Sequence, residues 1–113
     1  MYVYDRARLL AQDLKESEEF RAYKALKDEI YKDDTTRTLL KQYKKLQFQY
    51  QTQQLSGAAP DAAIAEQLKK YAELLSFNDK AAQYLAAEYR LQVIVNDIYK
   101  MIGDACEMDL DIF

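Results

Sequence analysis

Apolar residues recur at every third or fourth position along five successive stretches of this chain. This spacing matches the 3.6-residue period of an α-helix and predicts amphipathic helices. The 113 residues include only two Gly and one Pro, which are too few for the many turns of a β-sandwich or barrel. The sequence therefore predicts an all-α fold of about five helices, at residues 2–16, 18–32, 36–55, 62–76 and 80–105.

Short polar segments between these stretches carry the residues expected to begin and end helices. Ser17 and the pair Asp33-Asp34 precede the second and third helices, where side-chain oxygens bind free backbone N–H groups. Gly57 suits the residue just after a helix, and Asp61 suits the N-cap of the next one. Before the fifth helix, the sequence leaves the N-cap open between Asn78 and Asp79.

The lengths of the third and fifth helices predict an elongated bundle. At 1.5 Å per residue they reach about 30 and 40 Å, whereas a compact domain of this size has a radius of gyration of about 13 Å. A protruding apolar helix face usually packs on a second subunit, so we expect a homo-oligomer. Residues 1–113 are expected to form a single domain, with 107–113 as a flexible tail that alternates acidic and apolar residues. A role of this tail as a docking peptide is the alternative.

The main apolar stripes of the two long helices are expected to face the core. On the third helix the stripe is Leu39, Tyr43, Leu46 and Tyr50. On the fifth helix it is Tyr84, Leu91, Val95, Ile98 and Ile102.

The third helix also carries a basic face with an aromatic ring in it, opposite its apolar stripe. No acidic residue occurs between Thr35 and Pro60. One hypothesis is a contact surface for an acidic protein partner, and a second is a surface for the RNA backbone. Four cations are few for nucleic-acid binding in a chain of pI about 5.0. The simplest alternative is a solvated face whose Phe48 and Leu55 pack in a dimer. The candidate partner-binding residues of this face are Arg37, Lys41, Lys44, Lys45 and Phe48.

The fifth helix carries a second apolar strip, formed by Leu85, Tyr89 and Val93. The small residues Ala82 and Ala86 lie beside it. Two interpretations stay open, namely a subunit interface and a central helix that packs on both sides within one chain.

The residue inventory argues against an enzyme and against a resident metal. Without any His, the chain has no imidazole base, no Ser-His-Asp triad and no His-bound zinc. Cys106 is the single Cys, so no disulfide forms within the chain. We expect Cys106 to be a small buried apolar residue, and a reactive thiol or an intersubunit metal ligand is the weaker alternative. The first residues lack the apolar core of a signal peptide, and no apolar run is long enough to span a bilayer. We therefore expect a cytoplasmic protein.

The C-terminal third of the chain carries a specific set of residues, namely Asn78 to Ala82, Tyr84, Ala87-Glu88, Leu91-Gln92, Ile94 and Ile102 to Ala105. With these residues it resembles the YlbF/YmcA family of small helical regulators in Gram-positive bacteria. The upstream pattern agrees, with an N-terminal apolar stripe, an acidic break at Asp33-Asp34 and a long helix rich in Leu, Tyr and Gln. The resemblance covers nearly the whole chain.

This resemblance implies a self-associating helical protein without enzymatic activity. Family members act with paralogues and a partner called YaaT, in a complex linked to RNase Y, mRNA processing, competence, sporulation and biofilm formation. Some members carry a Cys-containing C-terminal extension implicated in iron–sulfur binding. This sequence stops at Phe113 with only Cys106, so we expect no iron–sulfur cluster and no other cofactor.

Overall fold

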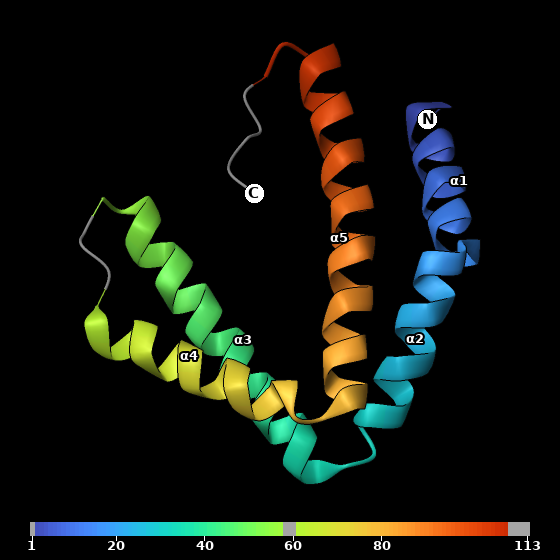
Figure 1. Cartoon of the computed structure of the whole chain (residues 1–113). Helices are drawn as coiled ribbons and strands as arrows, with labels where there is room; N and C mark the ends of the chain where they lie inside the picture. Colours follow the sequence, from blue (N-terminus) through green and yellow to red (C-terminus); the bar gives the residue numbers. More distant parts are fainter. Residues whose placement is uncertain (1, 58–60, 109–113) are drawn as a thin grey trace. The chain divides into compact units, whose positions relative to one another are not determined.

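The computed structural model describes residues 2–57 and 61–108 as helices and short connections, with no strand among them. The helices follow one another along the chain as Figure 1 shows. The all-α prediction is confirmed, and the helix bounds agree with the predicted ones to within about two residues. The helices are α1 (Tyr2–Glu16), α2 (Glu18–Ile30), α3 (Asp34–Leu55), α4 (Ala62–Ser76) and α5 (Asp79–Ala105).

The predicted N-caps form, which explains where the helices begin. The Ser17 hydroxyl accepts a hydrogen bond from the backbone N–H of Phe20. Asp61 accepts one from the N–H of Ala63 at 2.9 Å. Of the two candidates before α5, Asn78 is the cap, because its side-chain oxygen accepts from the N–H of Ala81 at 3.1 Å. Each cap satisfies a backbone donor that the first helical turn leaves free.

Asp33 caps α3 and is itself held by a hydroxyl donor. Its carboxylate accepts a hydrogen bond from the backbone N–H of Thr35 and one from the Thr36 hydroxyl at 2.7 Å. The Thr36 hydrogen bond lowers the pKa of Asp33 below its ordinary value, and the backbone N–H bonds add to this. Donors to a carboxylate favour its charged form.

Left-handed residues end the helices α3 and α5. Gly57 follows α3 with a φ of 77°, as the sequence predicted. After α5 the same position is occupied by Glu107, at a φ of 55°. The N–H of Met108 bonds to the carbonyl of Gly103 at 2.8 Å, and the N–H of Glu107 bonds to that of Asp104. These two bonds make a Schellman motif, so Glu107 and Met108, the first two residues of the predicted flexible tail, form a defined helix end. The rest of that tail, 109–113, lies outside the described residues, as do Ala58 to Pro60.

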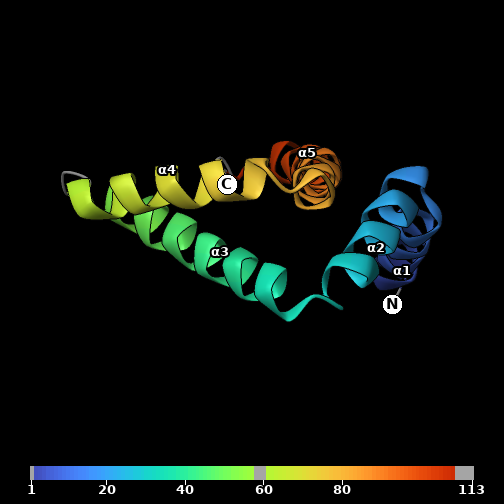
Figure 2. The ribbon, with the colours of Figure 1, turned by 60° about the horizontal axis from the view of Figure 1, so that its bottom comes forward.

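The chain divides into two compact units. One unit comprises Leu26–Tyr84, and the other comprises Met1–Ala25 together with Leu85–Phe113. In the first unit, α3 and α4 lie side by side as an antiparallel hairpin, which is visible in Figure 1 and Figure 2. The buried residues of this unit are Ile30, Thr36, Leu40, Leu46, Leu75, Ala81 and Tyr84.

The stripe predicted for α3 is buried or half-buried, but it is wider than expected. Leu46 is buried, and Leu39, Tyr43 and Tyr50 are half-buried. Leu40 is completely buried as well, although it lies outside the predicted stripe. In this unit α3 packs against α4, and its N-terminal half also contacts the start of α5, where Asn78 and Tyr84 bond to it. A helix with two neighbours needs a broader apolar face than a single stripe.

The second unit leaves many apolar side chains exposed. No residue of α1 is buried. On α5 the predicted stripe is partly wrong, because Val95 and Ile102 are exposed. A different line of residues along α5 is more buried, with spacings that alternate between three and four. It includes Ala87 and Ile94, which were not part of the predicted stripe. This line is Tyr84, Ala87, Leu91, Ile94 and Ile98. Within residues 2–57 and 61–108, no helix is long and apolar enough to cross a membrane.

Candidate functional site

Three residues of the predicted basic face lie exposed on α3, and they form the candidate site. They are Lys41, Lys45 and Phe48, and the Phe48 ring is 70% exposed. Neither lysine forms a hydrogen bond or ion pair with any other residue in the part of the chain that the structure describes. The sequence explains this, since α3 has no carboxylate after Asp34 to pair with them one turn away. We call these three residues the α3 surface.

Arg37 lies near the start of the same helix but is half-buried. Its guanidinium bonds to the carboxylate of Asp34, one turn earlier, at 2.6 Å. Arg37 therefore forms an ion pair within its own helix, and it is not part of the exposed α3 surface.

Lys44 departs from the expectation of a solvated basic residue. It is half-buried, and its ammonium group donates a hydrogen bond to the Tyr84 hydroxyl at 2.9 Å. The ammonium nitrogen also lies 5.1 Å from the centre of the Tyr84 ring, within the range of a cation–π interaction. Lys44 follows Leu40 by one helical turn, so it lies at the edge of the buried face. The ammonium group of Lys44 therefore binds the buried Tyr84 side chain at the edge of the core of this unit.

A shallow hollow lies beside Phe48, between α3 and the start of α4. Its volume is about 370 Å³, and its lining is mostly apolar. Ile64 of α4 is half-buried and contributes to the hollow, a role that the apolar spacing within one helix does not indicate. The hollow is lined by Phe48, Gln49, Thr52, Gln53 and Ile64.

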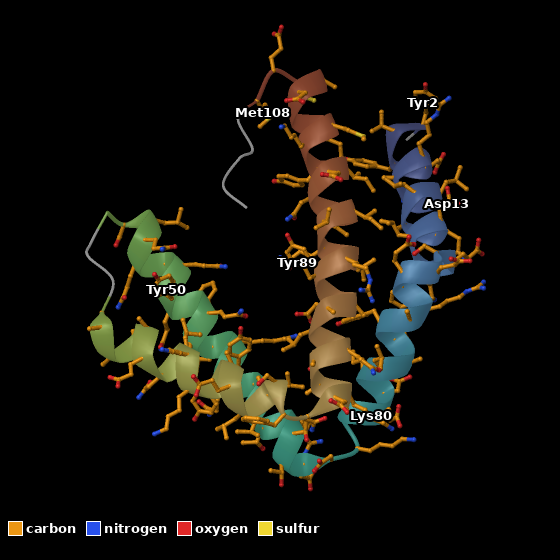
Figure 3. All side chains as sticks on the ribbon, viewed as in Figure 1. Tyr2, Asp13, Tyr50, Lys80, Tyr89 and Met108 are labelled. Atoms are coloured by element: carbon orange, nitrogen blue, oxygen red, sulfur yellow. The ribbon has the colours of Figure 1, made fainter. Side chains whose placement is uncertain are left out.

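Two larger grooves run along the remaining sides of the α3–α4 hairpin. The groove of about 410 Å³ includes Tyr50 and Lys69, and the groove of about 510 Å³ includes Leu74 and Lys70. Figure 3 shows Tyr50 on α3 within this hairpin. Glutamine side chains contribute to both grooves. Gln47, Gln51 and Gln54 of α3 line the first groove, whereas Gln42 of α3 and Gln67 of α4 line the second.

The residues of the second strip predicted on α5 belong to the other unit and differ in exposure. Leu85 is half-buried, Val93 is exposed, and Tyr89 is 68% exposed. Figure 3 shows Tyr89 projecting from the middle of the helix. The residues expected beside the strip, Ala82 and Ala86, are also exposed. This strip offers apolar contact area without filling the interior of its own unit.

The expectation that Cys106 is buried is wrong, because its side chain is exposed and its thiol is free. It lies at the end of α5, where the Schellman motif turns the chain away from the helix. Among residues 2–57 and 61–108, no group of three or more Cys, Asp or Glu side chains could hold a metal ion.

Comparison with known proteins places these features in a family. Residues 3–107 match the family model described as "Control of competence regulator ComK, YlbF/YmcA". The chain belongs to the YlbF/YmcA family. This confirms the resemblance seen in the sequence.

Two curated relatives of this YlbF/YmcA protein are named UPF0342 protein. A UPF0342 protein of Halothermothrix orenii is 34% identical over 110 residues, covering 97% of this chain and 93% of the relative. Another, from Caldicellulosiruptor bescii, is 37% identical over 105 residues and covers 93% and 88%.

Solved structures share the fold of this YlbF/YmcA protein. A protein of unknown function (DUF964) from Bacillus stearothermophilus aligns with a TM-score of 0.75 at 23% identity, covering 95% of this chain and 94% of that one. A chain from the crystal structure of Bacillus subtilis RicA in complex with RicF aligns with a TM-score of 0.59 at 26% identity, covering 94% of both chains. The second structure is a complex between two proteins.

Proposed function

We propose that this protein is a non-enzymatic regulatory adaptor of the cytoplasm that docks on another protein through the α3 surface. The observation that carries the proposal is that Lys41 and Lys45 are exposed, have no ion-pair partner among the described residues, and share a helix face with the exposed Phe48 ring. Large exposed apolar groups often mark places where proteins meet, and charges beside them favour a partner of complementary charge. The proposal includes no cofactor.

The family supports the regulatory part of this proposal. Its description names the control of a competence regulator, and the structural neighbour RicA is found in complex with RicF. We extend this to partners among family paralogues and a YaaT-like protein, in a complex linked to RNase Y-dependent mRNA processing. Control of competence, sporulation and biofilm formation would follow from that link.

Self-association is the second part of the proposal, and it involves the α5 strip of Leu85, Tyr89 and Val93. The exposed ring of Tyr89 and the exposed Val93 supply apolar area that contributes about 25 cal/mol per Å² when it is buried. The α3 surface belongs to the other unit, so the two proposed contacts use different residues.

RNA binding through the same face is less favoured by the arrangement of the cations. Arg37 is paired with Asp34, and Lys44 is bonded to Tyr84. Lys41 and Lys45 remain, and affinity for phosphates grows with the number of cations that contact them.

Affinity purification from the native host, followed by mass spectrometry, tests the adaptor proposal. We expect one or more proteins to co-purify in a fixed ratio, with a family paralogue or an RNase among them. Recovery of this protein alone, at its normal cellular concentration and after mild cross-linking, would refute the adaptor role.

A further inference from the structure

Phe48 lines the hollow, and Lys41 and Lys45, which have no ion-pair partner among the described residues, precede it on the same helix. Lys45 precedes Phe48 by three residues and Lys41 precedes it by seven. At 1.5 Å per residue, these offsets place the two lysine Cα atoms about 4.5 and 10.5 Å from that of Phe48 along the helix axis. Positions three and seven residues away share a face of the helix. An apolar hollow therefore continues into a row of two positive charges.

The charge of this feature selects an acidic ligand. Both lysines lack a carboxylate partner in the described part of the chain, and no acidic residue occurs from Thr35 to Pro60. The protein as a whole has a net charge of −3, so this cationic patch contrasts with its average surface. A complementary surface pairs an apolar side chain with nearby carboxylates.

The helical hairpin also limits the backbone conformation of a ligand. Extended peptides commonly bind by adding a strand to the edge of a sheet, and the described residues contain no strand. An extended backbone laid on α3 would give up hydrogen bonds to water without replacing them. A helix satisfies its own backbone groups and presents side chains at offsets of three, four and seven residues. These offsets match those of Lys45 and Lys41 from Phe48.

Resting on the adaptor function proposed above, we infer that the α3 surface and its hollow bind an acidic amphipathic helix of a protein partner. A large apolar side chain of that helix enters the hollow between Phe48 and Ile64. Carboxylates about one and two turns away from it pair with Lys45 and Lys41. The hollow, at about 370 Å³, has room for one large side chain.

A designed peptide tests this inference with the full-length protein. The probe is an Ala- and Gln-based helical peptide of about 18 residues, long enough to hold helical structure. It carries Phe at its centre and Glu four and seven residues to either side, so that it fits in either orientation. Backbone amide shifts of the protein are followed by NMR during titration. We expect the largest shifts at Lys45, Phe48 and Ile64.

Matched variants and peptides make the test specific. Binding should weaken at least about tenfold in Lys41→Glu/Lys45→Glu and in Phe48→Ala. It should be retained in Lys69→Glu/Lys70→Glu, which changes the charge of the same hairpin equally, and in Phe77→Ala, which removes another exposed ring. A peptide with Lys in place of each Glu should not bind.

Three results would overturn the inference. They are equal binding of the acidic and basic peptides, shifts confined to residues away from the hollow, and no shifts with the acidic peptide at millimolar concentration. A mixed-sequence RNA oligonucleotide serves as a further probe. If the acidic peptide causes no shifts, and if the protein binds RNA but Lys41→Glu/Lys45→Glu does not, the surface is a nucleic-acid site. If a partner still co-purifies while the acidic peptide fails to bind, the adaptor function stands and only the acidic-helix inference falls.

Discussion

The side-chain amide of Asn78 donates a hydrogen bond to the hydroxyl of Thr36 at 3.2 Å, although 42 residues separate them. The same hydroxyl donates to the carboxylate of Asp33, the N-cap of α3. Asn78 is in turn the N-cap of α5. A single buried hydroxyl thus joins the starts of two helices and fixes the base of the hairpin that carries the α3 surface.

Replacing Thr36 with Val should destabilise the protein by about 1–3 kcal/mol, because the shape is kept while the hydrogen-bond partner of Asn78 and Asp33 is lost. Chemical denaturation of wild type and variant measures this difference. Thr38→Val is the matched control, since Thr38 is exposed and its hydroxyl bonds only to the backbone carbonyl of Asp34. An equal loss of unfolding free energy in the two variants would show that the hydrogen bonds of Thr36 to Asn78 and Asp33 add no stability beyond that of an exposed threonine.

The lowered pKa of Asp33 predicts a specific dependence of stability on acid. In the folded state the carboxylate is favoured by the Thr36 hydrogen bond, so its pKa lies below the unfolded value of about 3.9. Its contribution to stability is complete above the unfolded pKa and is lost as pH falls through the folded one. The stability difference between wild type and Asp33→Asn should therefore shrink from pH 5 to pH 2. A constant difference over that range would contradict the assignment.

Glu107 occupies a left-handed position that glycine adopts without strain. Glu107→Gly should relieve about 1 kcal/mol of strain locally and slow amide exchange in the last turn of α5. Glu107→Gln is the control, because it removes the unfavourable charge at a helix C-terminus and keeps the strained backbone. If both variants protect the last turn equally, the charge and not the backbone conformation is responsible.

Introducing a charge at Tyr89 should weaken the proposed self-association. Burying an unpaired carboxylate in an apolar contact is costly, so Tyr89→Glu should shift the protein toward monomer in sedimentation equilibrium at tens of micromolar. Phe77→Glu, at an 86% exposed site in the other unit, should leave the association unchanged. A wild-type protein that is strictly monomeric under these conditions would refute the oligomer, and an unaffected oligomer in Tyr89→Glu would refute this interface.

Much of the fold follows from sequence pattern because helix ends and apolar periodicity are local properties. The caps at Ser17, Asp33 and Asp61 each depend on a residue and its neighbours within one turn. The end of α5 was less predictable, since Glu107 adopts a backbone conformation that its residue type disfavours.

The composition of the site was harder to predict, because it depends on contacts between distant segments. Lys44 and Lys41 look equivalent on α3, but only Lys44 reaches Tyr84, which lies 40 residues later. The hollow beside Phe48 depends on Ile64 of α4, and no spacing within one helix indicates it. Lys41, Lys45 and Phe48 are exposed on α3, but only the packed hairpin shows that Arg37 and Lys44 of the same predicted face are engaged with other residues.

The most direct test of the docking role compares partner capture by two double variants in the native host. Lys44 is left unchanged, since its substitution would disturb the bond to Tyr84. Quantitative mass spectrometry should show that Lys41→Glu/Lys45→Glu retains less than about a tenth of the partner bound by wild type, while Lys69→Glu/Lys70→Glu retains nearly all of it. Equal partner recovery with both variants, each folded by circular dichroism, would contradict a docking role for the α3 surface.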